Sequence, residues 1–151
     1  MPIEKPLHQV CSFALVVCRN TYAESPHYGK WLVVLETMGR GWWVPGGGVD
    51  HGESFITAAK RETVEEAGME VDCKGWLSVE SYKPTGKHSA KMMRCVLYAE
   101  PASLDAANNP KNQIDRESER AEWKTLAELE EFGRKKMLRA PEPLIWARYL
   151  E

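Results

Sequence analysis

Three glutamates, Glu62, Glu65 and Glu66, are spaced so that a single helix would carry them on one face. At about 100° per residue they fall within an arc of roughly 100°. Like charges at this spacing repel by about 0.2–0.5 kcal/mol per pair. Hard divalent cations bind clustered carboxylate oxygens, often together with backbone carbonyls. The spacing therefore predicts a cation site, although a solvated acidic helix face would show the same pattern.

The neighbouring residues favour the cation site. A glycine-rich run, residues 45–48, precedes the predicted helix and can supply a backbone carbonyl beside it. Glu53 stands at the head of the helix, where a carboxylate interacts favourably with the helix dipole. Arg61 points about 100° away from Glu62 and cannot neutralise all three glutamates. Arg61 also follows Glu53 by eight residues, so the start of the helix must fold back for these two to meet.

These residues resemble the Nudix box, whose fixed positions all match within residues 47–69. The matching residues are Gly47, Glu53, Arg61, Glu62, Glu65, Glu66, Gly68 and Met69. The family pattern has a bulky aliphatic residue where this chain has Thr63, and we expect a small loss of packing there without an effect on activity. Outside the box, Trp42 and Trp123 look like tryptophans that flank it in many members of the family.

The resemblance implies the Nudix fold, an α/β/α sandwich with a mixed central sheet. It also implies hydrolysis of a pyrophosphate bond in a nucleoside diphosphate linked to another moiety, with Mg²⁺ or Mn²⁺ as cofactor. The metal ligands that it implies are Glu62, Glu65, Glu66 and the carbonyl of Gly46. Arg61 would orient the catalytic glutamates, and Glu53 would hold the loop against the helix.

Two residues are candidates for the general base. A bound metal lowers the pKa of the attacking water and neutralises the leaving group, and a carboxylate that the metal does not use takes the proton. Glu66 lies within the predicted helix, whereas Glu117 lies six residues before Trp123, a spacing found in some family members. The stretch before Glu117 looks flexible, so we expect Glu117 to swing in when substrate binds. Glu119 is a weaker candidate, and all these charges can also be ordinary surface residues.

Substrate contacts are expected from a basic segment and from aromatic side chains. The cationic candidates in the segment are Lys83, Lys87, His88, Lys91 and Arg94. They could bind phosphates, but a solvated hairpin tip would have the same composition. Trp42 and Tyr82 could stack on a base, worth about 1–3 kcal/mol per base. Aromatic residues in strands lie more often in the core.

The rest of the sequence predicts the elements that position these residues. Strands are expected at residues 9–18, 31–36, 42–44, 71–82 (one or two strands around Gly75), 92–100 and 120–123. A helix is expected from Ser54 to about Ala67, ended by Gly68. Shorter helices should begin at the capping box 125–128 and at Pro141. Residues 45–48 are expected to be irregular, and residues 101–116 to form a long loop.

Length and composition fit one globular domain, residues 1–151, with 43% hydrophobic and 28% charged residues. The net charge of −2 excludes general affinity for nucleic-acid polymers. No apolar run approaches the ~20 residues that cross a bilayer. The first residues lack the apolar region of a signal peptide. We therefore expect a cytoplasmic protein without a membrane partner, acting on a small-molecule pyrophosphate.

Three functions stay open at this point. The first is a MutT-like nucleotide pyrophosphatase acting on a nucleoside di- or triphosphate, including oxidised guanine nucleotides. The second is a hydrolase of diphosphoinositol polyphosphates or dinucleoside polyphosphates, favoured by the run 45–48 and the basic segment 83–94. The third is a catalytically silent Nudix binding module. Such modules usually lose box glutamates, and this chain keeps all of them.

Overall fold

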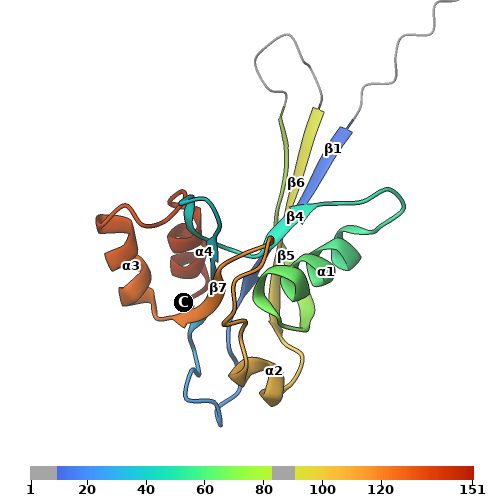
Figure 1. Cartoon of the computed structure of the whole chain (residues 1–151). Coiled ribbons are helices and arrows are strands. Elements are labelled where there is room, and N and C mark those ends of the chain that lie inside the picture. The colour runs from blue at the N-terminus through green and yellow to red at the C-terminus, as the bar shows by residue number, and fades with distance from the viewer. Residues whose placement is uncertain (1–9, 83–90) are drawn as a thin grey trace, which may run out of the picture.

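The computed structural model describes residues 10–82 and 91–151, which form two β-sheets and four helices (Figure 1). The larger sheet is mixed, with the order β4-β1-β6-β5, and its strands are β1 (Val10–Cys18), β4 (Gly46–Gly48), β5 (Val71–Tyr82) and β6 (Lys91–Pro101). Strands β1 and β6 are parallel, and the other pairs in this sheet are antiparallel. The smaller sheet is antiparallel, with the order β3-β2-β7, and contains β2 (Trp31–Glu36), β3 (Gly41–Trp43) and β7 (Arg120–Lys124).

Helices cover both faces of the mixed sheet. Alternate residues of β1 point to opposite faces. Ala14 and Val16 pack with the helix α1 (Phe55–Ala67), whereas Leu15 and Val17 pack with α3 (Leu126–Arg134) and α4 (Glu142–Leu150). Figure 1 shows α1 on one side of the strands and α3 and α4 on the other. The predicted α/β/α arrangement with a mixed sheet is confirmed, although three strands form a second sheet.

Helix α1 has the limits that its sequence predicts. The Ser54 hydroxyl accepts a hydrogen bond from the Thr57 N–H, and Gly68 ends the helix in the left-handed conformation with φ of 63°. Thr63 is fully buried, and its hydroxyl donates to the Ala59 carbonyl at 2.7 Å. This bond satisfies the polar group that threonine brings to a position where the family has an aliphatic residue.

The prediction that residues 45–48 are irregular is wrong. Gly46–Gly48 form strand β4, which pairs antiparallel with β1. A Cβ on Gly46 would lie 2.5 Å from the Ala14 carbonyl oxygen, so only glycine allows this close approach. The missing side chains that suggested a loop therefore let the strand pack tightly.

The second half of the chain differs from the prediction at one place. Within the expected loop 101–116, Ser103 caps a short helix, α2 (Leu104–Asn108). The predicted capping box at Thr125 and Glu128 is present at the start of α3, and Pro141 precedes α4 as expected. Strand β5 runs through Gly75 as one strand with two irregularities. Within the described ranges, no helix has the length and apolar character needed to cross a membrane.

Candidate active site

The glycine strand β4 lies against the acidic face of α1. The backbone N–H of Gly46 donates to Oε2 of Glu66 at 3.1 Å. Beside it, the Glu62 carboxylate packs so tightly on Gly47 that a Cβ there would be 2.5 Å away. The contact that Gly46 makes here is through its N–H group, and the role of its carbonyl as a metal ligand stays a prediction.

Arg61 organises the carboxylates around it. Its guanidinium makes two bonds of 2.9 Å to Glu53, one of 3.0 Å to Glu62 and one of 3.2 Å to Glu65. It also donates to the Gly48 carbonyl at 3.0 Å. Glu53 directly precedes the helix cap Ser54. The chain turns at this cap, and the turn brings the Glu53 side chain back to Arg61 although eight residues separate them. Arg61 therefore reaches two of the three box glutamates, more than its position on the helix indicated.

The surroundings of the glutamates shift their proton affinities. Burial raises the pKa of Glu66 to about 8, although the hydrogen bond from the Gly46 N–H acts in the opposite direction and lowers this pKa. Burial also raises the pKa of Glu62, while Arg61 opposes this shift. The hydrogen bonds from Arg61 hold the pKa of Glu53 below its usual value. The buried Glu66 carboxylate therefore favours a proton or a bound cation.

The donor set fits a hard divalent cation in kind, because Glu62, Glu65 and Glu66 all present carboxylate oxygens. The tight contact of Gly47 with Glu62 leaves this carboxylate little freedom. In the described part of the chain, no three acidic, histidine or cysteine side chains converge closely enough to hold a metal. Arg61 holds Glu62 and Glu65 instead, so these bonds must rearrange for the three glutamates to share one ion.

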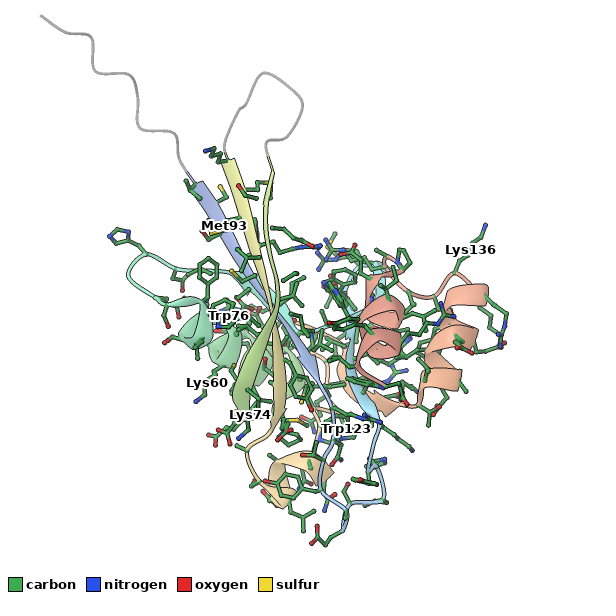
Figure 2. The ribbon with its side chains drawn as sticks, turned by 180° about the vertical axis from the view of Figure 1, so that it is seen from behind. Lys60, Lys74, Trp76, Met93, Trp123 and Lys136 are labelled. Carbon is green, nitrogen blue, oxygen red and sulfur yellow. The ribbon has the colours of Figure 1, made fainter. Side chains whose placement is uncertain are left out.

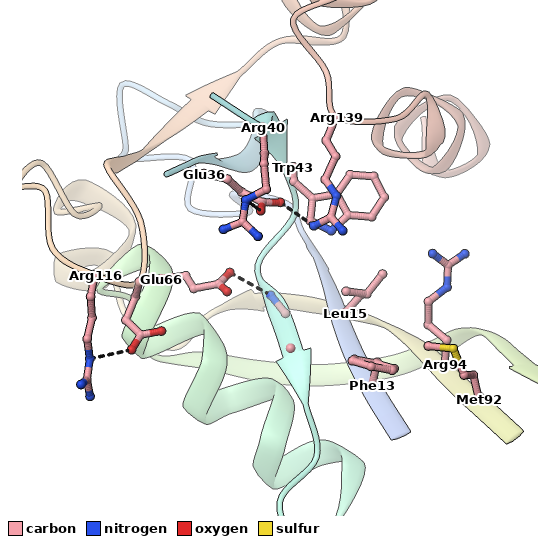
Figure 3. Close-up of a pocket in the computed structure, with 13 residues that line it drawn as sticks. Phe13, Leu15, Glu36, Arg40, Trp43, Glu66, Met92, Arg94, Arg116 and Arg139 are labelled. Carbon is pink, nitrogen blue, oxygen red and sulfur yellow. Dashed lines mark hydrogen bonds and ion pairs between the residues drawn. The ribbon is translucent and has the colours of Figure 1, made fainter. Parts of the chain in front are cut away.

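A cavity of about 400 Å³ opens beside Glu66 (Figure 3). Its floor is the sheet face that carries Leu15, extended by Phe13, Met92 and Arg94. The glycines of β4 and the Glu66 side chain form one wall. The other walls consist of the residues Glu36, Arg40, Trp43, Arg116, Glu117 and Arg139. The cavity therefore combines an apolar floor with arginine and carboxylate groups above it.

Glu117 already lies at this cavity, on a loop that is bonded to α1. The Ser118 hydroxyl donates to the Glu66 carbonyl at 2.6 Å and accepts from Lys111 Nζ at 2.8 Å. Asp115 in turn accepts from the Glu117 N–H at 2.8 Å. Glu117 also shares a shallow pocket with Glu65. These bonds place Glu117 near the box glutamates, and its movement on substrate binding stays a prediction.

The structure places the remaining predicted residues differently. Trp42 is buried and stacks on Phe132 at 5.4 Å, so it is not brought to the cavity. Arg94 lines the cavity, but it is bonded to Glu80 at 2.5 Å and to Glu142 at 2.6 Å. Tyr82 ends β5, and its side chain lies outside the described part. The predictions for Lys83 and Lys87 fall entirely outside the described residues.

Sequence reasoning missed a cluster on the opposite wall. The Glu36 carboxylate, on a residue only 8% exposed, bonds to Arg139 at 2.9 Å and to Arg40 at 3.2 Å. Arg139 also lies over the Trp43 ring, 5.4 Å from its centroid. A charged residue ending the apolar run 31–35 was the one available signal. No local pattern connects it to Arg139.

Comparisons with known proteins identify similar sequences and folds. The family model for the NUDIX domain matches residues 12–144. A NUDIX hydrolase from Nitrosomonas europaea superimposes with a TM-score of 0.67 and 20% identity, covering 94% of this chain and 90% of that one. The Ap4A hydrolase of C. elegans superimposes with a TM-score of 0.59 and 20% identity, covering 95% of this chain and 100% of that one. A MutT protein from Methanosarcina mazei Go1 superimposes with a TM-score of 0.56 and 19% identity, covering 89% of this chain and 99% of that one.

Among curated proteins, none matches the sequence significantly. The identities to the solved structures are low, so these structures show the common fold. The family model covers most of the chain, including the whole box and the loop that carries Glu117. Members of this family generally use divalent metal ions. The chain belongs to the Nudix hydrolase family.

Proposed function

We propose that this protein is a metal-dependent pyrophosphohydrolase that cleaves a pyrophosphate bond in a nucleoside di- or triphosphate. The observation that carries the proposal is that Glu66 and Glu117 face the same cavity, which also has arginines and an apolar floor. The carboxylates suit the reaction, the arginines suit phosphates, and the floor suits a base. These three features meet in a cavity large enough for a small ligand.

The residues of the box would have different roles in the reaction. Glu62, Glu65 and Glu66, with Gly46, would hold Mg²⁺ or Mn²⁺, which when bound lowers the pKa of a water and neutralises phosphate charge. Arg61 orients Glu62 and Glu65, and Glu53 fixes Arg61 through two hydrogen bonds. Glu117 is then the carboxylate left to accept the proton from water. Its side chain is 35% exposed and lines the cavity.

Charge in the cavity indicates where phosphates bind. Glu36 pairs with two arginines, Arg40 and Arg139, so this cluster keeps one positive charge. Arg94 pairs with two carboxylates and keeps none. The guanidinium groups of Arg40 and Arg139 are therefore the better phosphate ligands, because planar guanidinium forks bind phosphate oxygens in pairs.

The apolar floor favours a nucleotide over a diphosphoinositol polyphosphate. Phe13, Leu15 and Met92 offer a surface for a nucleobase, which an inositol ring with phosphates all around cannot use. A dinucleoside polyphosphate, which also contains a base, is the second candidate, and the similar C. elegans protein is named for Ap4A. A silent binding module is disfavoured because every box glutamate is present.

The test is an assay of the full chain with Mg²⁺ or Mn²⁺ against a panel with identified products. The panel contains nucleoside di- and triphosphates, oxidised guanine nucleotides, nucleotide sugars, dinucleoside polyphosphates and diphosphoinositols. We expect metal-dependent cleavage of a nucleotide, with release of a nucleoside monophosphate. Cleavage of diphosphoinositols alone, or of nothing in the panel, would contradict the proposal.

A further inference from the structure

Strand β5 is the outer strand of the mixed sheet. It pairs with β6 on one side, and in the ranges 10–82 and 91–151 no strand pairs with its other side. An outer strand presents unpaired backbone N–H and C=O groups that can bind another strand. Two apolar side chains on β5 are exposed, Trp76 by 52% and Val79 by 62%.

A bulge in β5 brings these two side chains to the same face. Trp76 lies opposite Leu97 and Val79 opposite Cys95, with a register shift between Trp76 and Ser78. Leu97 packs with the α1 side of the sheet, and Cys95, two residues away on β6, shares its face. In a regular strand, residues three apart face opposite sides. The bulge therefore creates an apolar stripe along the edge.

The stripe is continuous with α1. The Phe55 ring meets Trp76 edge to face, with 6.3 Å between centroids. Figure 2 shows Trp76 between β5 and α1, with Lys74 further along the same margin. A contact of this kind fixes the ring in place while leaving half of the side chain exposed. Trp76 is thus held in position at an unpaired strand edge.

We propose that β5 is the interface of a symmetric homodimer, in which the β5 strands of two copies pair antiparallel about a two-fold axis beside Ser78. In this register Trp76 lies opposite Val79 of the second copy, and the two-fold axis repeats the contact. A two-fold axis perpendicular to the sheet leaves the α1 face of both copies on the same side of the joined sheet. Residues that oppose each other across the axis must therefore lie on the same face of β5, and the bulge places Trp76 and Val79 on one face.

The strand is complementary to itself in this register. A large ring meets a smaller branched side chain twice, a favourable cross-strand pair. On the other face, Glu80 lies opposite Gly75 and next to Lys74 of the second copy, so no like charges oppose each other. A register shifted by one residue would set Trp76 opposite Ser78, which points to the other face. These features select a second copy of this chain as the partner.

The first test is the mass of the full chain in solution. Sedimentation between about 1 and 100 μM covers the range in which a dimer population depends on concentration. We expect a species of twice the 17.2 kDa of one chain. Val79→Lys should give the monomer, whereas Tyr149→Lys, on a residue 81% exposed on α4, should keep the dimer. A monomeric wild type at the highest concentration, or a dimer that survives Val79→Lys, would overturn the proposal.

The second test fixes the register and does not depend on how Val79→Lys folds. In a Cys11→Ser background, which removes the exposed native thiol, Trp76→Cys and Val79→Cys are combined. Opposed residues lie within the distance that a disulfide bridges. Mild oxidation should link two chains in the double variant and in neither single variant. Equal linking in the single variants would refute this register.

Discussion

Gly47 and the Glu62 carboxylate are packed so closely that any side chain at position 47 would displace this carboxylate. A Cβ there would lie 2.5 Å from both Cδ and Oε1 of Glu62. The backbone of Gly47 has no unusual φ, so the requirement is for space rather than for conformation. The first glycine of the box therefore sets the position of its first metal-ligand candidate.

Gly47→Ala should displace Glu62 and weaken Mg²⁺ binding, with activity falling about tenfold or more, as for other residues that position ligands. Gly48→Ala is the matched control, because a Cβ at Gly48 meets nothing within 4 Å. The measurement is the rate as a function of Mg²⁺ concentration for both variants. Equal behaviour of the two would contradict the role given to Gly47.

Glu66→Gln should change how the stability of the metal-free protein depends on pH. The pKa of Glu66 is raised by burial from 4.5 to about 8, so the folded state favours its protonated form. This contribution is complete below pH 4.5 and is lost as the pH rises through 8. The unfolding free energy of wild type should therefore fall relative to that of Glu66→Gln across this interval, in denaturant titrations with chelator. Parallel curves would contradict the burial of a charged Glu66.

Glu117→Gln should lower kcat by about 10²–10⁴-fold, the usual contribution of a general base, while KM and metal affinity change little. Glu119→Gln is the matched control, since Glu119 lies two residues away and does not line the cavity. Kinetics over Mg²⁺ concentration and pH separate the roles. A fall in metal affinity together with rate would make Glu117 a ligand, and an unchanged kcat would return the base to Glu66.

The sequence predicted α1 and its acidic face well because their determinants are local. The cap at Ser54, the stop at Gly68 and the spacing of Glu62, Glu65 and Glu66 all lie within a few turns of one helix. Strand β4 was missed because its partner is β1, more than 30 residues away in the chain. Glycine runs carry no strand signal of their own, and only the tertiary pairing makes them extended.

The cluster on the opposite wall of the cavity was also missed because its residues are distant in the chain. Glu36 and Arg139 are separated by 103 residues, and no pattern in the sequence joins them. The position of the Glu117 loop likewise depends on contacts between distant parts of the chain. These contacts come from Ser118 and Lys111, which bond to the end of α1 across the fold. A polar stretch without strand or helix signal therefore looked flexible.

Arg139→Gln should raise KM for a nucleotide by about tenfold or more, since a hydrogen bond to a charged group contributes about 1.5–3 kcal/mol. The effect on kcat should be smaller, because this arginine lies on the wall opposite the box. Arg148→Gln is the matched control: it removes an exposed arginine of α4 that pairs with Glu130 away from the cavity. A KM equal to that of the control would remove Arg139 from the phosphate site.

The most direct measurement is metal-dependent nucleotide hydrolysis by Glu65→Gln beside wild type. The Glu65 side chain is 38% exposed, and among the described residues its carboxylate bonds to Arg61, so the substitution should leave the fold intact. We predict that wild type releases nucleoside monophosphate only when Mg²⁺ or Mn²⁺ is present. The variant should lose about 10²–10³ in rate, the scale of removing one group that stabilises the transition state. Retention of more than about a third of the wild-type rate, less than 1 kcal/mol in the barrier, would contradict the assignment of the box glutamates to catalysis.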